Sequence, residues 1–233
     1  MLNQSLKRLY ESKWDLLQKN FRSIVADDLE NIKPANPLLI SLSDEEAFSS
    51  ADIRLMIFGQ ETNTWCRELN NLNVNDLQAE YKIWFYEGSA KSYGGFYRGL
   101  FRFVDLVKQR FPIKNIEFVW NNLSKIGKID GRGMQSQKLY KCENDCFNVI
   151  TEEIKTLKPN LILFLTGPNR DYLIQERLHA IDFSQIKDYE LNKLARINDL
   201  LDIPSFRTYH TQYLGFTKKT DEYFNAIIDE LNL

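Results

Sequence analysis

Four short and almost unbroken apolar segments constrain the fold of this chain more than any other feature of its sequence. They cover residues 53–59 (IRLMIFG), 116–121 (IEFVWN), 161–167 (LILFLTG) and 205–210 (SFRTYH). Strands that are buried on both faces of a sheet show this continuous pattern, because neither face meets water. Segments with helical periodicity separate them, and this alternation predicts parallel strands joined by right-handed crossovers. We therefore expect an α/β fold, a three-layer α/β/α sandwich with a central four-stranded parallel sheet.

The helical patterns place the expected helices between and after these strands. They cover residues 73–86, 96–111, 143–157, 171–178, 190–200 and 221–231. An amphipathic pattern at residues 2–23 predicts a further helix, within an N-terminal helical extension of residues 1–50 that packs on the rest. No repeat, low-complexity tract or linker interrupts the chain, so we expect one domain over residues 1–233.

Composition limits the classes of protein to which the chain can belong. Its 233 residues are 43% hydrophobic and include 15 Phe, 11 Tyr and 4 Trp, enough for one substantial core. No apolar run reaches membrane-spanning length, and we expect a cytoplasmic protein with no membrane partner. Cys142 and Cys146 lie four residues apart without a third ligand nearby, and no phosphate-binding glycine motif is present. We therefore expect no metal and no cofactor, and we expect a monomer.

The charge of the chain is small overall but unevenly distributed. The formal net charge is -2, which excludes a protein that is basic over its whole surface. Residues 91–141, however, contain eleven Lys and Arg and only three acidic residues. A basic stretch on an acidic body can concentrate a polyanion on one face. The alternative is a set of solvated helix faces, and the sequence leaves both interpretations open.

Polar side chains gather in the loops that follow the four expected strands. Open parallel sheets bind ligands beyond the carboxyl ends of their strands, where these loops meet. The loops GQETNTW, NNLSKIGK, GPNRD and YHTQYLG contain Glu61, Asn63, Asn121, Asn122, Lys125, Asn169 and His210. A carboxylate, several amides and an imidazole in one place are groups that catalysis uses. The asparagines also fit a structural role, since such side chains often satisfy backbone groups at strand ends.

The same loops, in this order, resemble the motifs of the uracil-DNA glycosylase superfamily. GQETNT stands where the best-known branch has GQDPYH, and VWNNLSK places Asn121 at the end of the second strand. YHTQYLG places His210 where the family has HPSP, and LKPNLILFLTGPNRD is similar to the segment ahead of that motif. The resemblance covers residues 53–215. It implies a DNA glycosylase that hydrolyses the N-glycosidic bond of a deaminated or damaged, uracil-like base in DNA.

The resemblance also implies a part in base excision for individual residues. Glu61 takes the place of the family's aspartate, which orients water and stabilises positive charge on the sugar. His210 donates a hydrogen bond to the leaving base, a contribution of about 3 kcal/mol. Asn121 recognises the base edge with one donor and one acceptor. Gln60 and Asn63 are expected to contact the substrate. One of the aromatic residues Tyr93, Phe96, Tyr97 and Trp65 is expected to form a wall on which the extruded base stacks. The basic residues expected to contact DNA phosphates are Lys125, Lys128 and Arg132.

The chain departs from the family at each motif, and the departures leave other functions open. Glu61 is one methylene longer than aspartate, Asn63 replaces the tyrosine that excludes thymine, and the prolines of HPSP are missing. One alternative is a catalytically silent protein of the same fold that binds nucleic acid or a nucleobase. Another is an enzyme for free nucleosides with Glu61 as nucleophile. The basic stretch favours a polymer, because a nucleoside has no phosphates to neutralise.

Overall fold

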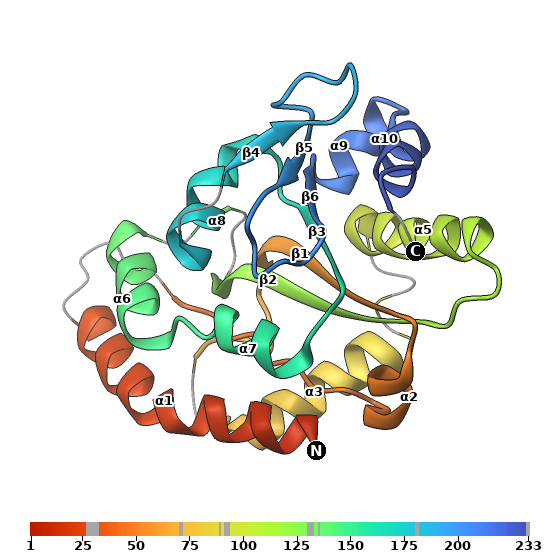
Figure 1. Cartoon of the computed structure of the whole chain (residues 1–233). Helices are drawn as coiled ribbons and strands as arrows, with labels where there is room; N and C mark the ends of the chain where they lie inside the picture. Colours follow the sequence, from red (N-terminus) through yellow and green to blue (C-terminus); the bar gives the residue numbers. More distant parts are fainter. Residues whose placement is uncertain are drawn as a thin grey trace.

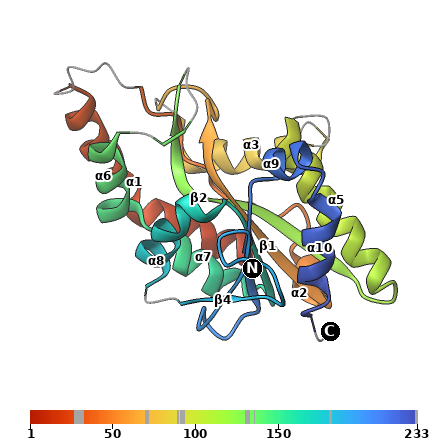
Figure 2. The ribbon, with the colours of Figure 1, turned by 90° about the horizontal axis from the view of Figure 1, so that it is seen from above.

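A six-stranded mixed sheet between two layers of helices forms the centre of the structure (Figures 1 and 2). The structure is a computed structural model that describes residues 1–26, 33–69, 72–88, 90, 94–129, 133–134, 136–179 and 182–231. The strand order in the sheet is β2-β1-β3-β6-β5-β4. The strands are β1 (Ile53–Asn63), β2 (Ile116–Lys128), β3 (Leu161–Leu165), β4 (Phe183–Gln185), β5 (Leu194–Ile197) and β6 (Ser205–Thr208).

The four apolar segments of the sequence are neighbouring parallel strands, but they are not the whole sheet. β1 pairs with β2 and β3, and β3 pairs with β6, in each case parallel. β5 and β4 extend the sheet beyond β6 as antiparallel strands, so the expected four-stranded parallel sheet is incomplete. The expected helix over residues 190–200 is wrong, because this segment contains β5. Its apolar residues Leu194, Ala195 and Ile197 are buried within the sheet.

Helices cover both faces of the sheet. They are α1 (Leu2–Ala26), α2 (Glu45–Ser50), α3 (Val74–Tyr86), α5 (Gly94–Arg110), α6 (Gln137–Phe147), α7 (Ile150–Leu157), α8 (Asp171–Leu178), α9 (Thr211–Phe216) and α10 (Thr220–Ile228), with a short 3₁₀ helix η1 (Pro168–Arg170). α5, α9 and α10 pack together on one face, and α1, α6, α7 and α8 lie on the other (Figures 1 and 2). The single helix expected over residues 143–157 is divided into α6 and α7, because Asn148 has extended backbone geometry. Within the described part of the chain, no helix is long and apolar enough to cross a bilayer.

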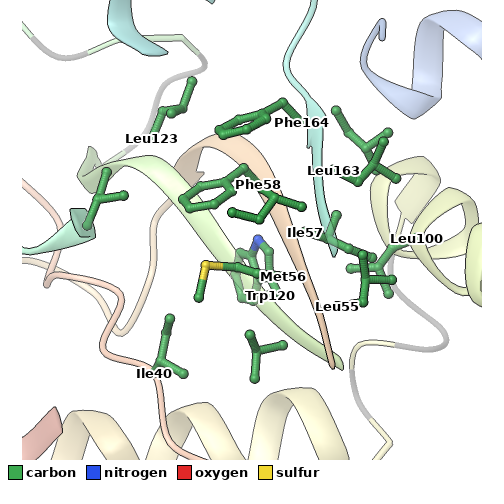
Figure 3. Packing of buried hydrophobic residues seen from close by; sticks show 14 of the residues in the cluster. Ile40, Leu55, Met56, Ile57, Phe58, Leu100, Trp120, Leu123, Leu163 and Phe164 are labelled. Carbon is green, nitrogen blue, oxygen red and sulfur yellow. The ribbon is translucent and has the colours of Figure 1, made fainter. Parts of the chain in front are cut away.

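Apolar side chains from both faces of the central strands form the core. Phe58 of β1 stacks on Phe164 of β3, with ring centroids 4.7 Å apart and an angle of 11° between the planes (Figure 3). The neighbouring residue Ile57 points to the other face, toward Leu100 of α5 (Figure 3). All four side chains are fully buried. Because successive residues of a strand point to opposite faces, both layers of helices are anchored on the same strand.

The edge of the sheet at β2 is covered by polar contacts from other elements. The hydroxyl of Tyr81, in α3, donates to the carbonyl of Trp120 at 2.8 Å and accepts from its amide at 2.9 Å. Further along the strand, the amide of Leu38 donates to the carbonyl of Lys125 at 2.8 Å. An open edge strand would expose unpaired backbone groups to other chains. Here the covered edge holds β2 in place up to its carboxyl end.

A fully buried ion pair connects the carboxyl end of β2 to the helix α7. Lys125 Nζ lies 2.8 Å from Glu153 Oε1, and neither side chain is exposed. Asn121 accepts from Lys125 Nζ at 2.7 Å and donates to Glu153 Oε2 at 2.8 Å, while the Tyr10 hydroxyl donates to Glu153 at 2.6 Å. Burial lowers the pKa of Lys125, and the charge of Glu153 opposes this change. The expected phosphate contact of Lys125 is therefore wrong, since its ammonium group does not reach the surface.

A second buried ion pair joins β2 to α6 and α8. Arg177 Nη2 donates to Glu143 Oε1 at 2.9 Å, and both side chains are inaccessible to solvent. The hydroxyl of Ser124 and the amide of Lys125 also donate to Glu143, at 2.7 and 2.9 Å. Each buried carboxylate thus accepts several hydrogen bonds, which buried charges require to offset the loss of hydration.

We expect Lys125→Met to destabilise the fold strongly, because it leaves the Glu153 carboxylate buried without its cation. Breaking one side of a buried pair costs about 3–5 kcal/mol of unfolding free energy, which urea denaturation measures. The control is Lys155→Met, which removes an exposed pair with Glu152 at 2.8 Å. An exposed pair contributes less than about 1 kcal/mol. Equal losses in the two variants would contradict the importance of the buried pair.

Candidate functional site

A pocket of about 920 Å³ opens at the carboxyl end of the parallel strands, beside α5 and α9. Five residues that the sequence predicts for catalysis or substrate binding line it, namely Gln60, Glu61, Asn63, Phe96 and His210. They come from the end of β1, the start of α5 and the turn between β6 and α9. Two further predicted residues, Tyr93 and Arg132, lie outside the described residues.

Asn122 lines this pocket, and Asn121 does not. In the sheet, Asn122 is paired with Gly59, whereas Asn121 is paired with Phe58 and points to the opposite face. There Asn121 is bonded to Glu153 and Lys125. The expectation that Asn121 belongs to the site is therefore wrong, and the next residue, Asn122, takes its place. Such a shift exchanges the two faces of a strand, because side chains alternate with a period of two.

The side-chain amide of Asn122 uses its oxygen in a hydrogen bond with the protein and leaves its amino group available to donate to a ligand. Its Oδ1 accepts from the indole Nε1 of Trp120 at 3.1 Å, which identifies the other atom as Nδ2. Nδ2 is buried and has no hydrogen-bond partner among the described residues. Gly59 permits the close approach of β1, since a Cβ atom there would lie 2.5 Å from Asn122 Oδ1. A buried, unpaired donor costs about 1–3 kcal/mol, so a ligand carbonyl at this point would recover that free energy.

Glu61 holds a nearly buried carboxylate that is paired with Arg170. Its side chain is 7% exposed, and Arg170 Nη2 lies 3.3 Å from Oε1 and 3.4 Å from Oε2. Burial raises the pKa of Glu61 above its ordinary value of 4.5, while the charges of Arg170 and Lys128 oppose the rise. Lys128 itself is partly buried and does not line the pocket. Arg170, in η1, is a residue that the sequence analysis missed.

His210 presents a neutral imidazole to the same pocket. It caps the amino end of α9, where its Nδ1 accepts from the amide of Gln212 at 3.3 Å. Its ring stacks on Phe96, with centroids 5.4 Å apart and 26° between the planes. Burial lowers the pKa of His210 below its ordinary value of 6.5. Since Nδ1 accepts a hydrogen bond, the neutral ring carries its proton on Nε2, which is then a donor.

Aromatic rings form most of the remaining wall. Trp65, Trp84 and Trp120 line the pocket, and these are three of the four tryptophans in the sequence. Trp65 and Tyr97 each pack edge-on against Trp120, at centroid distances of 5.6 and 5.2 Å. The sequence analysis named Phe96, Tyr97 and Trp65 as possible walls but missed Trp84 and Trp120, because an aromatic residue within an apolar pattern indicates core. Such a wall suits a planar, apolar ligand face.

The loop that follows Glu61 has a strained backbone. Thr64, Cys66 and Arg67 have φ angles of 52°, 48° and 65°, in the left-handed region that residues other than glycine rarely adopt. Thr64 and Cys66 also line the pocket. Strained residues of this kind cluster at binding and catalytic sites, where the surrounding structure holds them in place. The strain therefore supports the interpretation of this pocket as a functional site.

The basic residues of segment 91–141 do not form one continuous face. α5 and α6, which carry most of those described, lie on opposite sides of the sheet (Figures 1 and 2). Two of the cations on α5 are also paired with acids, Arg102 with Asp221 at 2.6 Å and Arg110 with Asp229 at 3.9 Å. Of the two interpretations that the sequence left open, this arrangement favours separate solvated helix faces over a single basic surface for the described residues.

No known protein family matches this chain, and the described residues hold no cluster of metal-ligating side chains. The chain matches no protein-family model and no curated protein. Across the described ranges, no three His, Cys, Asp or Glu side chains are placed to hold a metal ion together. Cys142 and Cys146 approach to 3.9 Å between sulfur atoms, but they lie on α6 and do not line the pocket.

We expect the imidazole of His210 to titrate below pH 6.5, because burial disfavours its charged form. His179 and His210 are the only histidines in the sequence, so His179→Gln leaves His210 as the single imidazole signal in an NMR titration. As pH falls, the folded protein should retain the neutral ring of His210 to a lower pH than an unfolded chain does. A midpoint at or above 6.5 would contradict the expected effect of burial on this imidazole.

Proposed function

We propose that this protein is a DNA glycosylase, a divergent member of the uracil-DNA glycosylase superfamily that removes a deaminated or damaged base. The observation that carries the proposal is the presence of Glu61, Asn122 and His210 around one aromatic-lined pocket. Base excision needs a carboxylate near the sugar, donors at the base edge and a wall on which the extruded base stacks. The position of the pocket beyond parallel strands, the usual site for ligands in α/β sheets, supports the same proposal.

Each group has a defined part in the proposed reaction. The bond between the sugar C1′ and the base nitrogen breaks, and its electron pair leaves with the base. A water oxygen bonds to C1′ and transfers a proton to the Glu61 carboxylate, which also stabilises positive charge on the sugar. His210 Nε2–H donates to an oxygen of the base as negative charge develops there. Phe96, stacked on His210, provides a plane against which the base lies.

The donors favour bases that carry carbonyl oxygens. Asn122 offers its amino group, and His210 offers an N–H group, so both recognise acceptors on the base. Uracil, hypoxanthine and xanthine present such oxygens, which deamination creates from amino groups. Asn63 lines the pocket where the best-known branch of the superfamily has a tyrosine, and a volume of about 920 Å³ accommodates purines as well as pyrimidines.

A second function is favoured by one observation, the ion pair between Arg170 and Glu61. The guanidinium group lies 3.3 Å from the carboxylate and partly neutralises it. A neutralised carboxylate stabilises a cationic sugar less well than a free one. In this alternative the protein binds a nucleobase or nucleic acid through the same pocket without cleaving the glycosidic bond.

The test of the proposal is cleavage of oligonucleotides that each contain one uracil, hypoxanthine or xanthine. We expect the wild-type protein to release at least one of these bases, detected as alkali-sensitive strand scission. Glu61→Gln keeps the shape but removes the charge, and should slow release by about 10²–10⁴-fold, the usual contribution of a positioned acid or base. Glu152→Gln, an exposed change on α7, is the matched control and should have no effect.

Binding distinguishes the two functions when no cleavage is found. Because Trp65, Trp84 and Trp120 line the pocket, a base that enters it should change the tryptophan fluorescence. A fluorescence change without base release supports the silent binding protein. No release and no fluorescence change with any of the three bases would contradict both functions.

We expect Asn122→Asp to weaken recognition of uracil-containing DNA by roughly 5- to 100-fold, because it replaces a donor with an acceptor. Asn121→Asp should act differently, since it places a second carboxylate beside the buried Glu153 and lowers the melting temperature. Melting curves and the base-release assay measure both effects. If Asn121→Asp changed base preference and Asn122→Asp did not, the assignment of Asn122 to the pocket would be wrong.

A further inference from the structure

Exposed aromatic rings surround the mouth of the pocket. Among the described residues, the exposed aromatic side chains are Phe216 at 79%, Tyr172 at 50% and Tyr213 at 49%. Phe216 and Tyr213 belong to α9 and line the pocket. The other large apolar side chains that are exposed in the described ranges, such as Ile113, are aliphatic. Large rings in water forfeit the free energy of burial, so their restriction to one place indicates a binding surface.

The rings flank the mouth from two directions. Tyr172 lies in the first turn of α8, which begins at Asp171 directly after η1, and its hydroxyl donates to the sulfur of Met134 at 3.0 Å. Met134 follows Gly133, which lines the pocket. Tyr172 therefore lies on the β2 and η1 side of the mouth, whereas Phe216 and Tyr213 lie on the α9 side.

Tyr209 connects the two sides of the mouth. Its ring packs against that of Tyr213, with centroids 4.5 Å apart and 41° between the planes. It also borders Gly167 at the start of η1, where a Cβ atom would lie 3.6 Å from Tyr209 Cδ1. The aromatic residues thus continue from α9 to the loop that carries Arg170, the partner of Glu61.

Charge at the mouth suits a single strand better than a duplex. Lys218 follows Phe216 closely and is exposed, while Arg170 is already paired with Glu61. The described basic residues of segment 91–141 lie mostly on α5 and α6, on opposite sides of the sheet, so this segment adds no single basic face to these cations. Duplex binding depends largely on phosphate contacts, because the faces of paired bases are covered by their neighbours. Single strands leave those faces free, and proteins bind them by stacking bases on aromatic side chains.

We infer that the mouth of the pocket binds single-stranded DNA. The bases on the two sides of the base in the pocket stack on Phe216 and Tyr213 in one direction and on Tyr172 in the other. This inference rests on the proposed function, since it requires a base in the pocket. It adds the form of the DNA, which the pocket alone does not specify.

Fluorescence anisotropy with two labelled probes tests the inference. One probe is a single strand of about ten nucleotides, within the range that such surfaces cover, with one central uracil. The other is the same strand annealed to its complement. We expect the single strand to bind at least about tenfold more tightly, and Phe216→Ala and Tyr172→Ala each to weaken its binding by roughly 5- to 100-fold. Phe216→Trp retains a stacking plane and should retain binding.

The matched control is Ile113→Ala, since Ile113 is 89% exposed but precedes β2 at the opposite end of the strands. It should leave binding unchanged, and melting temperatures verify that all variants fold. Equal or tighter duplex binding, no measurable binding of either probe, or unchanged binding after loss of the rings would each overturn the inference. Preferred single-strand binding without base release would instead refute only the glycosylase activity, so the two failures are distinguishable.

Discussion

The buried ion pair between Lys125 and Glu153 determines which residues of β2 can reach the pocket. Lys125 and Asn121 are four residues apart on one strand and therefore share a face, and both are bonded to Glu153 on the α7 side. Trp120 and Asn122 must then face the opposite layer, where the pocket lies. A buried pair adds little net stability, because desolvation offsets its attraction. Its consequence here is positional, since any other register of β2 would leave a charge buried without its partner.

Burial disfavours the charged forms of Glu61 and His210, two titratable residues of the pocket, and therefore moves their pKa values in opposite directions. It raises the pKa of Glu61 and lowers that of His210, because the charged form of each loses hydration. The surroundings therefore favour a neutral imidazole, while the charges of Arg170 and Lys128 favour the carboxylate form of Glu61. A neutral imidazole and a carboxylate are the states that the proposed reaction requires of His210 and Glu61, which line the same pocket.

The sequence predicts the parallel strands well because they are buried on both faces, which leaves a continuous apolar pattern. The same double burial hides the alternation that separates Asn121 from Asn122, so the pattern cannot show which of them faces the site. β5 was beyond prediction for a different reason: its short apolar run, 194–197, has a spacing that a helix shares. In the sequence, Lys125 lies in a polar segment beyond the expected strand 116–121 and suggests a surface cation, although β2 extends to Lys128 and contains it. Its partner Glu153 lies 28 residues away, and only the tertiary structure brings them together.

The ion pair between Glu61 and Arg170 links the carboxyl end of β1 to η1, which follows β3. Glu61 is the third residue of GQETNT and has a longer side chain than the aspartate of GQDPYH, and Arg170 is the last residue of η1. Burial raises the pKa of this carboxyl, which is 7% exposed, and the charge of Arg170 opposes that rise by favouring the carboxylate form. The same cation weakens the field that Glu61 exerts on a positively charged sugar. Under the proposed function, the strength of this ion pair with a nucleotide in the pocket therefore separates a site that cleaves the glycosidic bond from one that only binds its ligand.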